Sequence, residues 1–285
     1  MDDDLVWRAG LHVLDCGPRA LVMGILNVTP DSFSDGGRFF DQEAAVTRGI
    51  EMVEEGADLV DVGGESTRPG AGAVSVPDEL NRVVPVIKRL AAEVDVPISV
   101  DTRKSEIAQA ALEAGASIVN DVSAGSDPRM IEVVRSSGAG MVLMHMRGEP
   151  ATMTDLTDYR DVVGEVRSYL SERVEAVVRS GIERVQLAVD PGLGFAKTTP
   201  QSLLLMKDIS VFAGIGRPLL VGPSRKSFVG HVVGTEVDDR VDGTAGAVAW
   251  LVANGANIVR VHDVRAMVHV VRMVEAIRRA EPGTA

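Results

Sequence analysis

The strongest constraint on the fold is an eightfold alternation of short apolar segments with longer amphipathic segments. The apolar segments have the length and β-branched content of strands, and Gly, Pro, Asp or Asn residues bound them. They cover residues 20–26, 58–62, 97–100, 117–119, 140–144, 185–189, 218–221 and 257–261. Strict alternation of strands with helices favours a parallel sheet, and continuous apolar strands favour a sheet that is buried on both faces.

Helical patterns lie between these strands, at residues 42–55, 77–93, 104–113, 128–137, 159–180, 200–212, 240–253 and 265–279. The length of 285 residues and the eight units predict a single-domain (β/α)8 TIM barrel, a fold that typically takes about 250 residues. The rival architecture is an open doubly wound sheet. Its main signature, a GxGxxG motif after the first strand, does not occur here.

The segment before the barrel has a different pattern. Residues 11–16, flanked by Gly10 and Gly17, are expected to form a short hairpin that covers the lower end of the barrel. We therefore divide the chain into an N-terminal hairpin segment (1–19), the barrel (20–280) and a short tail (281–285).

Composition narrows the function. The net charge of −12 argues against a nucleic-acid surface, which needs a basic face. Cys16 is the single cysteine, so an intrachain disulfide is impossible, which suits a reducing cytoplasm. The start of the chain is acidic, unlike a secretory signal, and no apolar run reaches the roughly 18 residues of a membrane span. We expect a cytoplasmic protein that binds small molecules and neither nucleic acid nor membrane.

Polar residues gather where the predicted strands end. In a (β/α)8 barrel the active site is built from these carboxyl ends and the loops that follow them. Any single Asp or Asn there is also consistent with a helix cap or a turn, but so many at one end indicate a site. The strand ends carry Asn27, Gly63, Gly64, Glu65, Asp101, Asn120, Asp121, His145, Asp190, Gly222, Arg260 and His262.

Part of this set suits a flat heterocycle that carries many hydrogen-bond donors. Asp101, Asn120 and Asp190 supply acceptors, and a carboxylate accepts two hydrogen bonds from an amidine-like edge. The cationic side chain of Arg260 or Lys226 would stack on the face of such a ring.

Three loops are longer or more polar than ordinary turns. Residues 25–37 and 63–72 are rich in glycine and resemble lids, although disordered loops are the simpler alternative. Residues 222–228 follow the seventh strand, where such barrels often bind phosphate, and their Ser-Arg-Lys sequence opens a helix that attracts anions. A solvated basic patch is the alternative. It is disfavoured because Arg260, which would add to the charge, lies within an apolar strand.

Two other groups of residues receive a structural interpretation. His145 and His262 lack the spacing of zinc ligands. The methionines are expected to form the core and the wall of a pocket rather than a metal site, and they include Met141, Met144, Met146 and Met153.

Eight motifs together resemble those of the dihydropteroate synthase family, the folate-pathway enzymes that sulfonamides target. They read GILNVTPDSFSDGG, DVGGESTRPG, SVDT, VND, VLMHMRG, DPGLGFAKT, GPSRKSF and RVHDV, in family order and at family spacing over about residues 20–279. The resemblance implies a homodimeric TIM barrel. It also implies the condensation of 6-hydroxymethyl-7,8-dihydropterin diphosphate with 4-aminobenzoate, which releases diphosphate and uses Mg²⁺.

The resemblance also assigns roles to residues. The expected catalytic residues are Asp101, Asp190, Lys226 and Arg260. The expected pterin-binding residues are these four together with Asn120, and Met144, Phe195 and Gly222 are expected to bind substrate. Asn27 is the expected Mg²⁺ contact, through the diphosphate. The residues expected to face the diphosphate are Arg68, Arg260 and His262. The aminobenzoate pocket is expected to consist of Phe33, Thr67, Pro69 and Ser224.

Two alternatives stay open. A pterin-dependent methyltransferase would share Asp101, Asn120 and Asp190 but would have less use for the SRK, STRP and NVTPDSF sequences. A non-catalytic pterin-binding paralogue would have lost residues that bind Mg²⁺ or diphosphate, and none is missing here. The clearest departure from the family pattern is Ala196, which stands where glycine is common.

Overall fold

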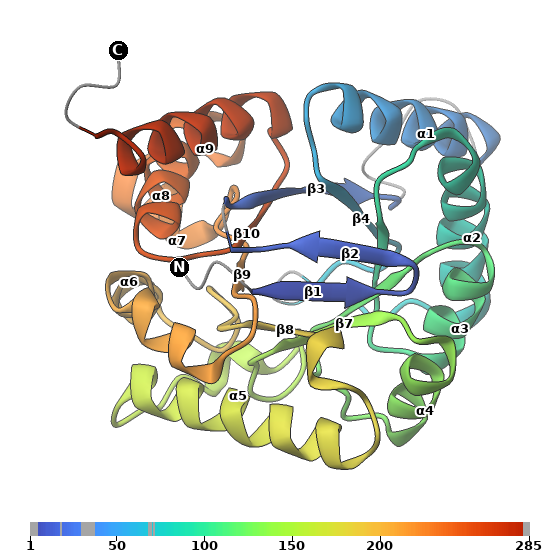
Figure 1. Ribbon diagram of the computed structural model, residues 1–285, viewed down its shortest axis with the longest axis horizontal. Coiled ribbons are helices and arrows are strands. Elements are labelled where there is room, and N and C mark those ends of the chain that lie inside the picture. Colours follow the sequence, from blue (N-terminus) through green and yellow to red (C-terminus); the bar gives the residue numbers. More distant parts are fainter. Residues whose placement is uncertain (1–4, 18, 30–37, 68–69, 71, 282–285) are drawn as a thin grey trace.

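A ring of parallel strands enclosed by helices forms the body of the protein (Figure 1). The computed structural model describes residues 5–17, 19–29, 38–67, 70 and 72–281. The strands of the ring are β3 (Leu21–Asn27), β4 (Leu59–Gly63), β5 (Ile98–Asp101), β6 (Ile118–Asp121), β7 (Gly140–Met144), β8 (Leu187–Asp190), β9 (Leu220–Val221) and β10 (Ile258–Val261). They pair in the order β8-β7-β6-β5-β4-β3-β10-β9, and a bridge between Val189 and Leu219 joins β8 to β9. The predicted (β/α)8 barrel is thus confirmed.

The helices follow the predicted pattern with one break. The α-helices are α1 (Arg38–Glu54), α2 (Val76–Glu93), α3 (Ser105–Glu113), α4 (Pro128–Ser137), α5 (Val162–Arg179), α6 (Thr199–Lys207), α7 (Ser227–Val233), α8 (Val241–Ala253) and α9 (Val264–Arg278). The 3₁₀ turns are η2 (Met153–Asp155), η3 (Arg184–Gln186), η4 (Ile209–Ile215) and η5 (Val237–Asp239). The predicted helix over residues 200–212 is wrong in its second half, because α6 ends before Asp208 and η4 follows. Ile209 and Phe212 are both fully buried, and their spacing of three suits a 3₁₀ turn.

Local sequence explains where helices begin and end. The Asp127 side chain accepts a hydrogen bond from the backbone N–H of Arg129, which caps α4. Thr198 and Gln201 form a capping box at the start of α6. Gly138 ends α4 with φ of +71°, a conformation that glycine adopts without steric cost.

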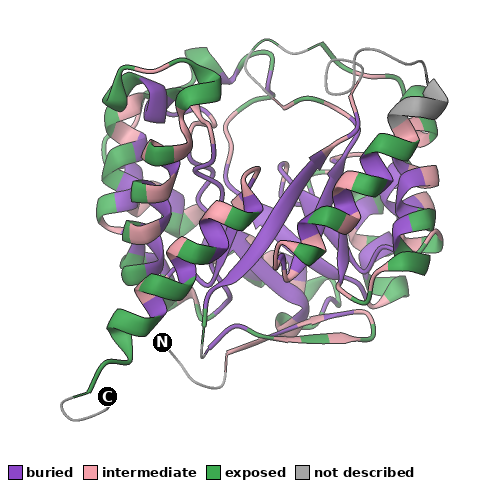
Figure 2. Ribbon diagram, turned by 90° about the horizontal axis from the view of Figure 1, so that it is seen from above, coloured by how far each residue is buried: buried purple, intermediate pink, exposed green. Residues whose placement is uncertain are grey.

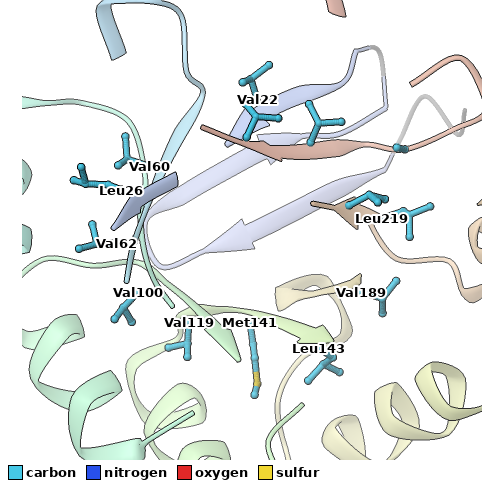
Figure 3. Packing of buried hydrophobic residues seen from close by; sticks show 14 of the residues in the cluster. Val22, Leu26, Val60, Val62, Val100, Val119, Met141, Leu143, Val189 and Leu219 are labelled. Carbon is cyan, nitrogen blue, oxygen red and sulfur yellow. The ribbon is translucent and has the colours of Figure 1, made fainter. Parts of the chain in front are cut away.

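The strands separate two apolar layers. Side chains that point outward pack against the helices, as Figure 3 shows for Val100, Val119 and Leu143. Side chains that point inward fill the barrel and belong to a second cluster, which includes Leu59, Ile118 and Ile258. Because side chains alternate along a strand, the next inward residue after each of these lies two positions further on.

Those next inward residues are polar, so the interior changes character along the barrel axis. Asp61 follows Leu59 on β4, Asn120 follows Ile118 on β6, and Arg260 follows Ile258 on β10. On β8, Asp190 likewise follows the buried Ala188. An apolar floor therefore lies beneath a polar layer at the carboxyl ends of the strands.

A β-hairpin covers the opposite, amino-terminal end of the barrel (Figure 2). Its strands are β1 (Val6–Ala9) and β2 (His12–Asp15). The predicted hairpin over residues 11–16 is therefore displaced, because Gly10, with φ of +60°, lies in the turn rather than before the first strand. Trp7 is fully buried beneath the barrel floor and donates a hydrogen bond to Gln186 O at 2.8 Å.

Across the described ranges, no helix combines the length and the apolar character that crossing a membrane requires.

Candidate active site

Five predicted residues lie at the carboxyl end of the barrel, and we call them the polar ring: Asp101, Asn120, Asp190, Lys226 and Arg260. Asp101, Asn120 and Asp190 are buried, with 8%, 5% and 6% of their surface exposed. Arg260 donates from Nη2 to Asp101 Oδ2 at 2.7 Å. The sequence thus predicted a group of residues that the fold does bring together.

Asp61 is a central member of this network that sequence reasoning missed. It is fully buried, and its Oδ2 accepts hydrogen bonds from Asn120 Nδ2 at 2.9 Å and from Arg260 Nε at 2.5 Å. The signal was present in the sequence, since Asp61 is a charged residue within the apolar segment 58–62, as Arg260 is within 257–261.

The guanidinium of Arg260 binds two carboxylates. Arg260 contacts Asp61 and Asp101 at the same time, so a single positive charge faces two potential negative charges. Burial raises the pKa of Asp101 to about 7 although Arg260 opposes the rise, and the charge of Asp61 adds to it. We conclude that Asp101 carries a proton more readily than an exposed aspartate does.

Asp190 anchors the loop that follows β8. Its Oδ1 accepts a hydrogen bond from Gly192 N at 2.7 Å. Burial raises the pKa of Asp190, and Lys226 opposes that rise. Burial lowers the pKa of Lys226 to about 8, with Asp190 opposing the shift. The buried Asp190 and the half-buried Lys226 therefore interact as opposite charges at the mouth of the barrel.

Lys226 also holds Phe195 in place. Its Nζ donates to Leu193 O and lies 4.6 Å from the centre of the Phe195 ring. Ala196 has φ of +49°, a left-handed conformation that costs any residue with a Cβ, so the glycine expected here would fit with less strain.

Lys197 and His145 form a second buried pair at the end of β7. Lys197 Nζ lies 3.0 Å from His145 Nδ1 and donates to Phe195 O at 2.8 Å. Burial lowers the pKa of Lys197 to about 7, and burial together with the charge of Lys197 lowers the pKa of His145 to about 3. His145 is therefore a neutral hydrogen-bond partner at physiological pH. Lys197 belonged to a recognised motif, but its role was not predicted.

The Ser-Arg-Lys sequence divides between two roles. Ser224 Oγ lies 3.0 Å from His262 Nδ1, so these two predicted residues meet at the ends of β9 and β10. Arg225 instead pairs with Asp263 through two contacts, Nε–Oδ2 at 2.9 Å and Nη2–Oδ1 at 2.5 Å. The expectation that Arg225 adds to an anion-binding cluster is not supported by this contact, because its guanidinium is engaged by Asp263, the residue that precedes α9.

Three further predicted residues border the polar ring. Met144 ends β7 beside Gly192, and Gly222 follows β9 beside Arg260. Asn27 ends β3. A Cβ placed on Gly63 would lie 3.8 Å from Asn27 Oδ1 and 3.7 Å from Asp101 Oδ2. The absence of a side chain at Gly63 therefore keeps open the space that Asn27 and Asp101 share.

The loop after β4 is tied to the β5–α3 turn by charged groups. Lys104 Nζ contacts Glu65 Oε2 at 2.7 Å and the buried Glu79 Oε2 at 2.6 Å. Thr102 donates to Glu79 Oε1 at 2.8 Å. Half-buried Thr67 follows this anchored segment. The other predicted residues of the two long loops, Phe33, Arg68 and Pro69, lie outside the described residues.

The described part of the site offers few ligands for a metal ion. Among the described residues, no three His, Cys, Asp or Glu side chains are grouped so as to hold a metal ion. A single amide oxygen, that of Asn27, suits Mg²⁺ only where a substrate's phosphates supply other ligands.

Two hollows lie away from the polar ring. One of about 510 Å³ is lined by Arg19, Asp58 and Glu275 near the amino-terminal ends of the strands. Another of about 580 Å³ is lined by Arg147 and Tyr169, between the β7 end and α5. We place the candidate active site at the polar ring because the buried charges and perturbed pKa values converge there.

The polar ring places hydrogen-bond acceptors and cations together at the mouth of a (β/α)8 barrel, an arrangement that suits an enzyme binding a flat nitrogen heterocycle. The family described as "Pterin binding enzyme" matches residues 23–262 of this chain. Dihydropteroate synthase of Synechocystis sp. is 46% identical over 272 residues, which cover 95% of this chain and 94% of that protein.

Solved structures agree with this relationship. Xanthomonas albilineans dihydropteroate synthase with 4-aminobenzoic acid has a TM-score of 0.92 and 44% identity, and the match covers 97% of this chain and 99% of that one. The same enzyme in complex with 7,8-dihydropteroate has a TM-score of 0.88 and 40% identity, over 97% and 100% of the two chains. The chain belongs to the dihydropteroate synthase family.

Proposed function

We infer that this protein is a dihydropteroate synthase. It condenses 6-hydroxymethyl-7,8-dihydropterin diphosphate with 4-aminobenzoate to give 7,8-dihydropteroate and diphosphate in folate biosynthesis. The observation that carries the inference is the polar ring, whose buried acceptors stand at the mouth of a barrel that belongs to this family. The C–O bond between the pterin methylene and the diphosphate breaks, a C–N bond to the aromatic amine forms, and the amine nitrogen loses a proton.

The polar ring is assigned to the pterin. Asp101, Asn120 and Asp190 present oxygen acceptors to its N–H groups, and Lys226 reaches the ring atoms. Arg260 lies on the ring face, where a guanidinium interacts favourably with a π-system. When diphosphate departs, positive charge develops on the methylene carbon and the attached ring. The carboxylates of Asp101 and Asp190 stabilise that charge in a site of low dielectric constant.

The diphosphate is assigned to the opposite side of the mouth. Arg68, Arg260 and His262 are assigned to it, and Asn27 would contact a Mg²⁺ ion that the diphosphate itself binds. When bound, Mg²⁺ neutralises charge on the leaving group. The absence of a Cβ at Gly63 leaves room beside Asn27 Oδ1 for a hydrated ion.

The second substrate is assigned to the rim. Thr67 and Ser224, from the β4 and β9 loops, are assigned to the aminobenzoate pocket together with Phe33 and Pro69. The ion pairs of Lys104 with Glu65 and Glu79 support the base of the β4 loop. This division places the aminobenzoate above the pterin.

The decisive assay mixes the protein with Mg²⁺, pterin diphosphate and labelled 4-aminobenzoate. We expect labelled dihydropteroate. A folded protein that binds pterin without forming product would contradict the enzyme assignment and favour a non-catalytic paralogue. In a separate assay, transfer of a methyl group from methyltetrahydrofolate to a corrinoid acceptor would favour the methyltransferase alternative.

A pair of variants tests the pterin assignment. Asp190→Ala should lose pterin binding. Asp121→Asn is the matched control, because Asp121 is also a buried carboxylate but caps its own loop through the N–H groups of Ser123 and Gly125. The control should lower stability and keep pterin affinity. Normal pterin affinity in Asp190→Ala would refute the assigned role.

We further propose that two copies associate through the face formed by α6, α7 and α8. These helices contact one another and expose the large apolar side chains of Leu204, Val232, Val233 and Trp250, and the turn between α7 and α8 exposes Val237. Exposed apolar side chains on neighbouring helices are typical of an interface, and a symmetric homodimer is the commonest oligomer.

Sedimentation analysis tests the dimer. Val232→Glu, at a position 59% exposed, should produce a monomer. Leu11→Glu, at the fully exposed hairpin turn on another part of the molecule, should leave the mass unchanged. A monomeric native protein would refute the dimer, and a dimeric Val232→Glu variant would refute this surface.

The free, buried Cys16 suits our assignment of the enzyme to the cytoplasm.

A further inference from the structure

Asp61 is a charged residue in the interior of the barrel that the proposed function leaves without a role. It lies at the middle of β4 and is fully buried. Its inward neighbour on the same strand, Leu59, belongs to the apolar floor. A buried carboxylate is costly unless other groups compensate its charge, so its contacts indicate what it does.

The contacts of Asp61 reach two members of the polar ring. Its Oδ2 accepts from Asn120 Nδ2 at 2.9 Å and from Arg260 Nε at 2.5 Å. Because a carboxylate only accepts hydrogen bonds, the Asn120 amide must turn its nitrogen toward Asp61. This contact fixes the rotation of the amide. The contact of Asp61 with Arg260 Nε also fixes the orientation of the guanidinium. In this orientation Arg260 Nη2 donates a hydrogen bond to Asp101 Oδ2 at 2.7 Å.

Asp61 also belongs to a layer whose polar atoms are not all paired. Asp61 and Ser99 are register partners on β4 and β5, and Asp101 lies two residues beyond Ser99. Within the described part of the chain, Asp61 Oδ1, Ser99 Oγ and Asp101 Oδ1 are buried without a hydrogen-bond partner. Ser99 therefore shares the depth of Asp61 in the barrel but contacts neither Asn120 nor Arg260 through a hydrogen bond, which makes it a suitable control.

We propose that Asp61 is a positioning residue for the pterin: from below, it holds Asn120 and Arg260 in the orientation that receives the ring. This inference rests on the proposed function, because it assigns the polar ring to the pterin. Asp61 acts through its neighbours and not by touching the reacting atoms. Its influence should fall on pterin affinity and leave the affinity for aminobenzoate, which is assigned to the rim, unchanged.

The test compares Asp61→Asn with Ser99→Ala and with the native protein. The first variant removes the charge and keeps the shape, whereas the second removes an unpaired polar atom at the same depth. Dissociation constants for 6-hydroxymethyl-7,8-dihydropterin diphosphate are measured by calorimetry without aminobenzoate. We expect Asp61→Asn to weaken binding on the order of ten- to hundredfold, as expected for lost hydrogen bonds between charged groups. Ser99→Ala should stay within about twofold of the native value.

The pH dependence of pterin binding adds a second measurement. The charged groups that interact with Asp101 come from β4, α2, β6, β10 and the residue that precedes α7, and these are Asp61, Glu79, Asp121, Arg260 and Lys226. Removal of the negative charge of Asp61 lowers the pKa of Asp101, because like charges favour the neutral acid. The acid limb of pterin binding should therefore move to lower pH in Asp61→Asn, and a purely structural role would leave it in place.

Two results would overturn the proposal: an unchanged pterin affinity in Asp61→Asn, or an equal loss in Ser99→Ala. If Asp61→Asn does not fold, NMR of the native protein decides. The Arg260 Nε–H signal, identified by its absence in Arg260→Lys, should exchange slowly and shift when pterin binds. Fast exchange would overturn the proposal. Turnover of the native protein tests the proposed function separately, so a failure of one is distinguishable from a failure of the other.

Discussion

Gly192 permits a close approach that no other residue tolerates, and substitution by alanine provides a sharp test. Its φ is +68°, and a Cβ at this position would lie 2.1 Å from the backbone oxygen of His145. Because the Cβ and the His145 oxygen are both fixed by the backbone, no side-chain rotation relieves this contact. The loop after β8 must therefore move, and the movement breaks the 2.7 Å hydrogen bond from Gly192 N to Asp190 Oδ1.

The expected loss in the free energy of unfolding follows from two contributions. Alanine in a left-handed conformation costs about 1–2 kcal/mol. A lost hydrogen bond to a charged group costs about 1.5–3 kcal/mol. Gly192→Ala should therefore lose about 2.5–5 kcal/mol in total.

Gly194→Ala is the matched control. Gly194 has φ of +76°, but the nearest atom to a Cβ there is Lys226 Cδ at 3.5 Å, an ordinary contact. This variant should lose only the backbone contribution of about 1–2 kcal/mol. Urea unfolding gives both values, and calorimetry gives the pterin affinity, which should fall strongly in Gly192→Ala because Asp190 loses its orienting bond. Equal losses of stability in the two variants would refute the steric argument.

Three further predictions concern protons and metal. The pKa of Asp101 is raised to about 7, so the folded state binds this proton more tightly than the unfolded chain does. The tighter binding contributes to the free energy of unfolding below about pH 4, and this contribution is lost as the pH rises through about 7. Asp101→Asn should therefore reduce the fall in urea midpoint between pH 5 and pH 8, and an unchanged fall would contradict the assignment. His145 should stay neutral at pH 5, because burial and the charge of Lys197 lower its pKa to about 3. Its C2–H proton signal in NMR is the one that disappears in His145→Asn, and titration of that signal near neutral pH would disprove the prediction. Chelation of Mg²⁺ should slow product formation at least about tenfold while binding of 6-hydroxymethyl-7,8-dihydropterin persists, and equal turnover with and without chelator would exclude the proposed use of the ion.

The periodic part of the fold was predictable from the sequence. Strands and helices follow from apolar periodicity, and the positions of the strands gave the polar ring without any knowledge of contacts. The predicted position of the hairpin was wrong because a glycine such as Gly10 is equally typical of a strand boundary and of a turn. The helix predicted over residues 200–212 changes to a 3₁₀ turn because the burial of Ile209 and Phe212 depends on tertiary packing.

The supporting residues of the site were less accessible. Asp61 and Arg260 are 199 positions apart, and their contact depends on closure of the barrel. Lys197 and His145 are 52 positions apart and belong to different strand ends. Arg225 shows the opposite error, since a basic residue in an anion-binding sequence is engaged by Asp263. Local sequence indicates which residue types are present, whereas the partner of each buried charge is decided by the fold.

The hairpin beneath the barrel has a kinetic consequence. Trp7 and the apolar floor seal the amino-terminal end of the described interior, so substrates that reach the polar ring enter from the carboxyl end. Of the two proposed subsites, that of the pterin is the deeper and that of the aminobenzoate lies at the rim. A molecule bound at the rim therefore blocks the entry of pterin to the deeper subsite and its release from it. Pterin diphosphate should bind first, and an aminobenzoate analogue should trap the bound pterin and slow its release.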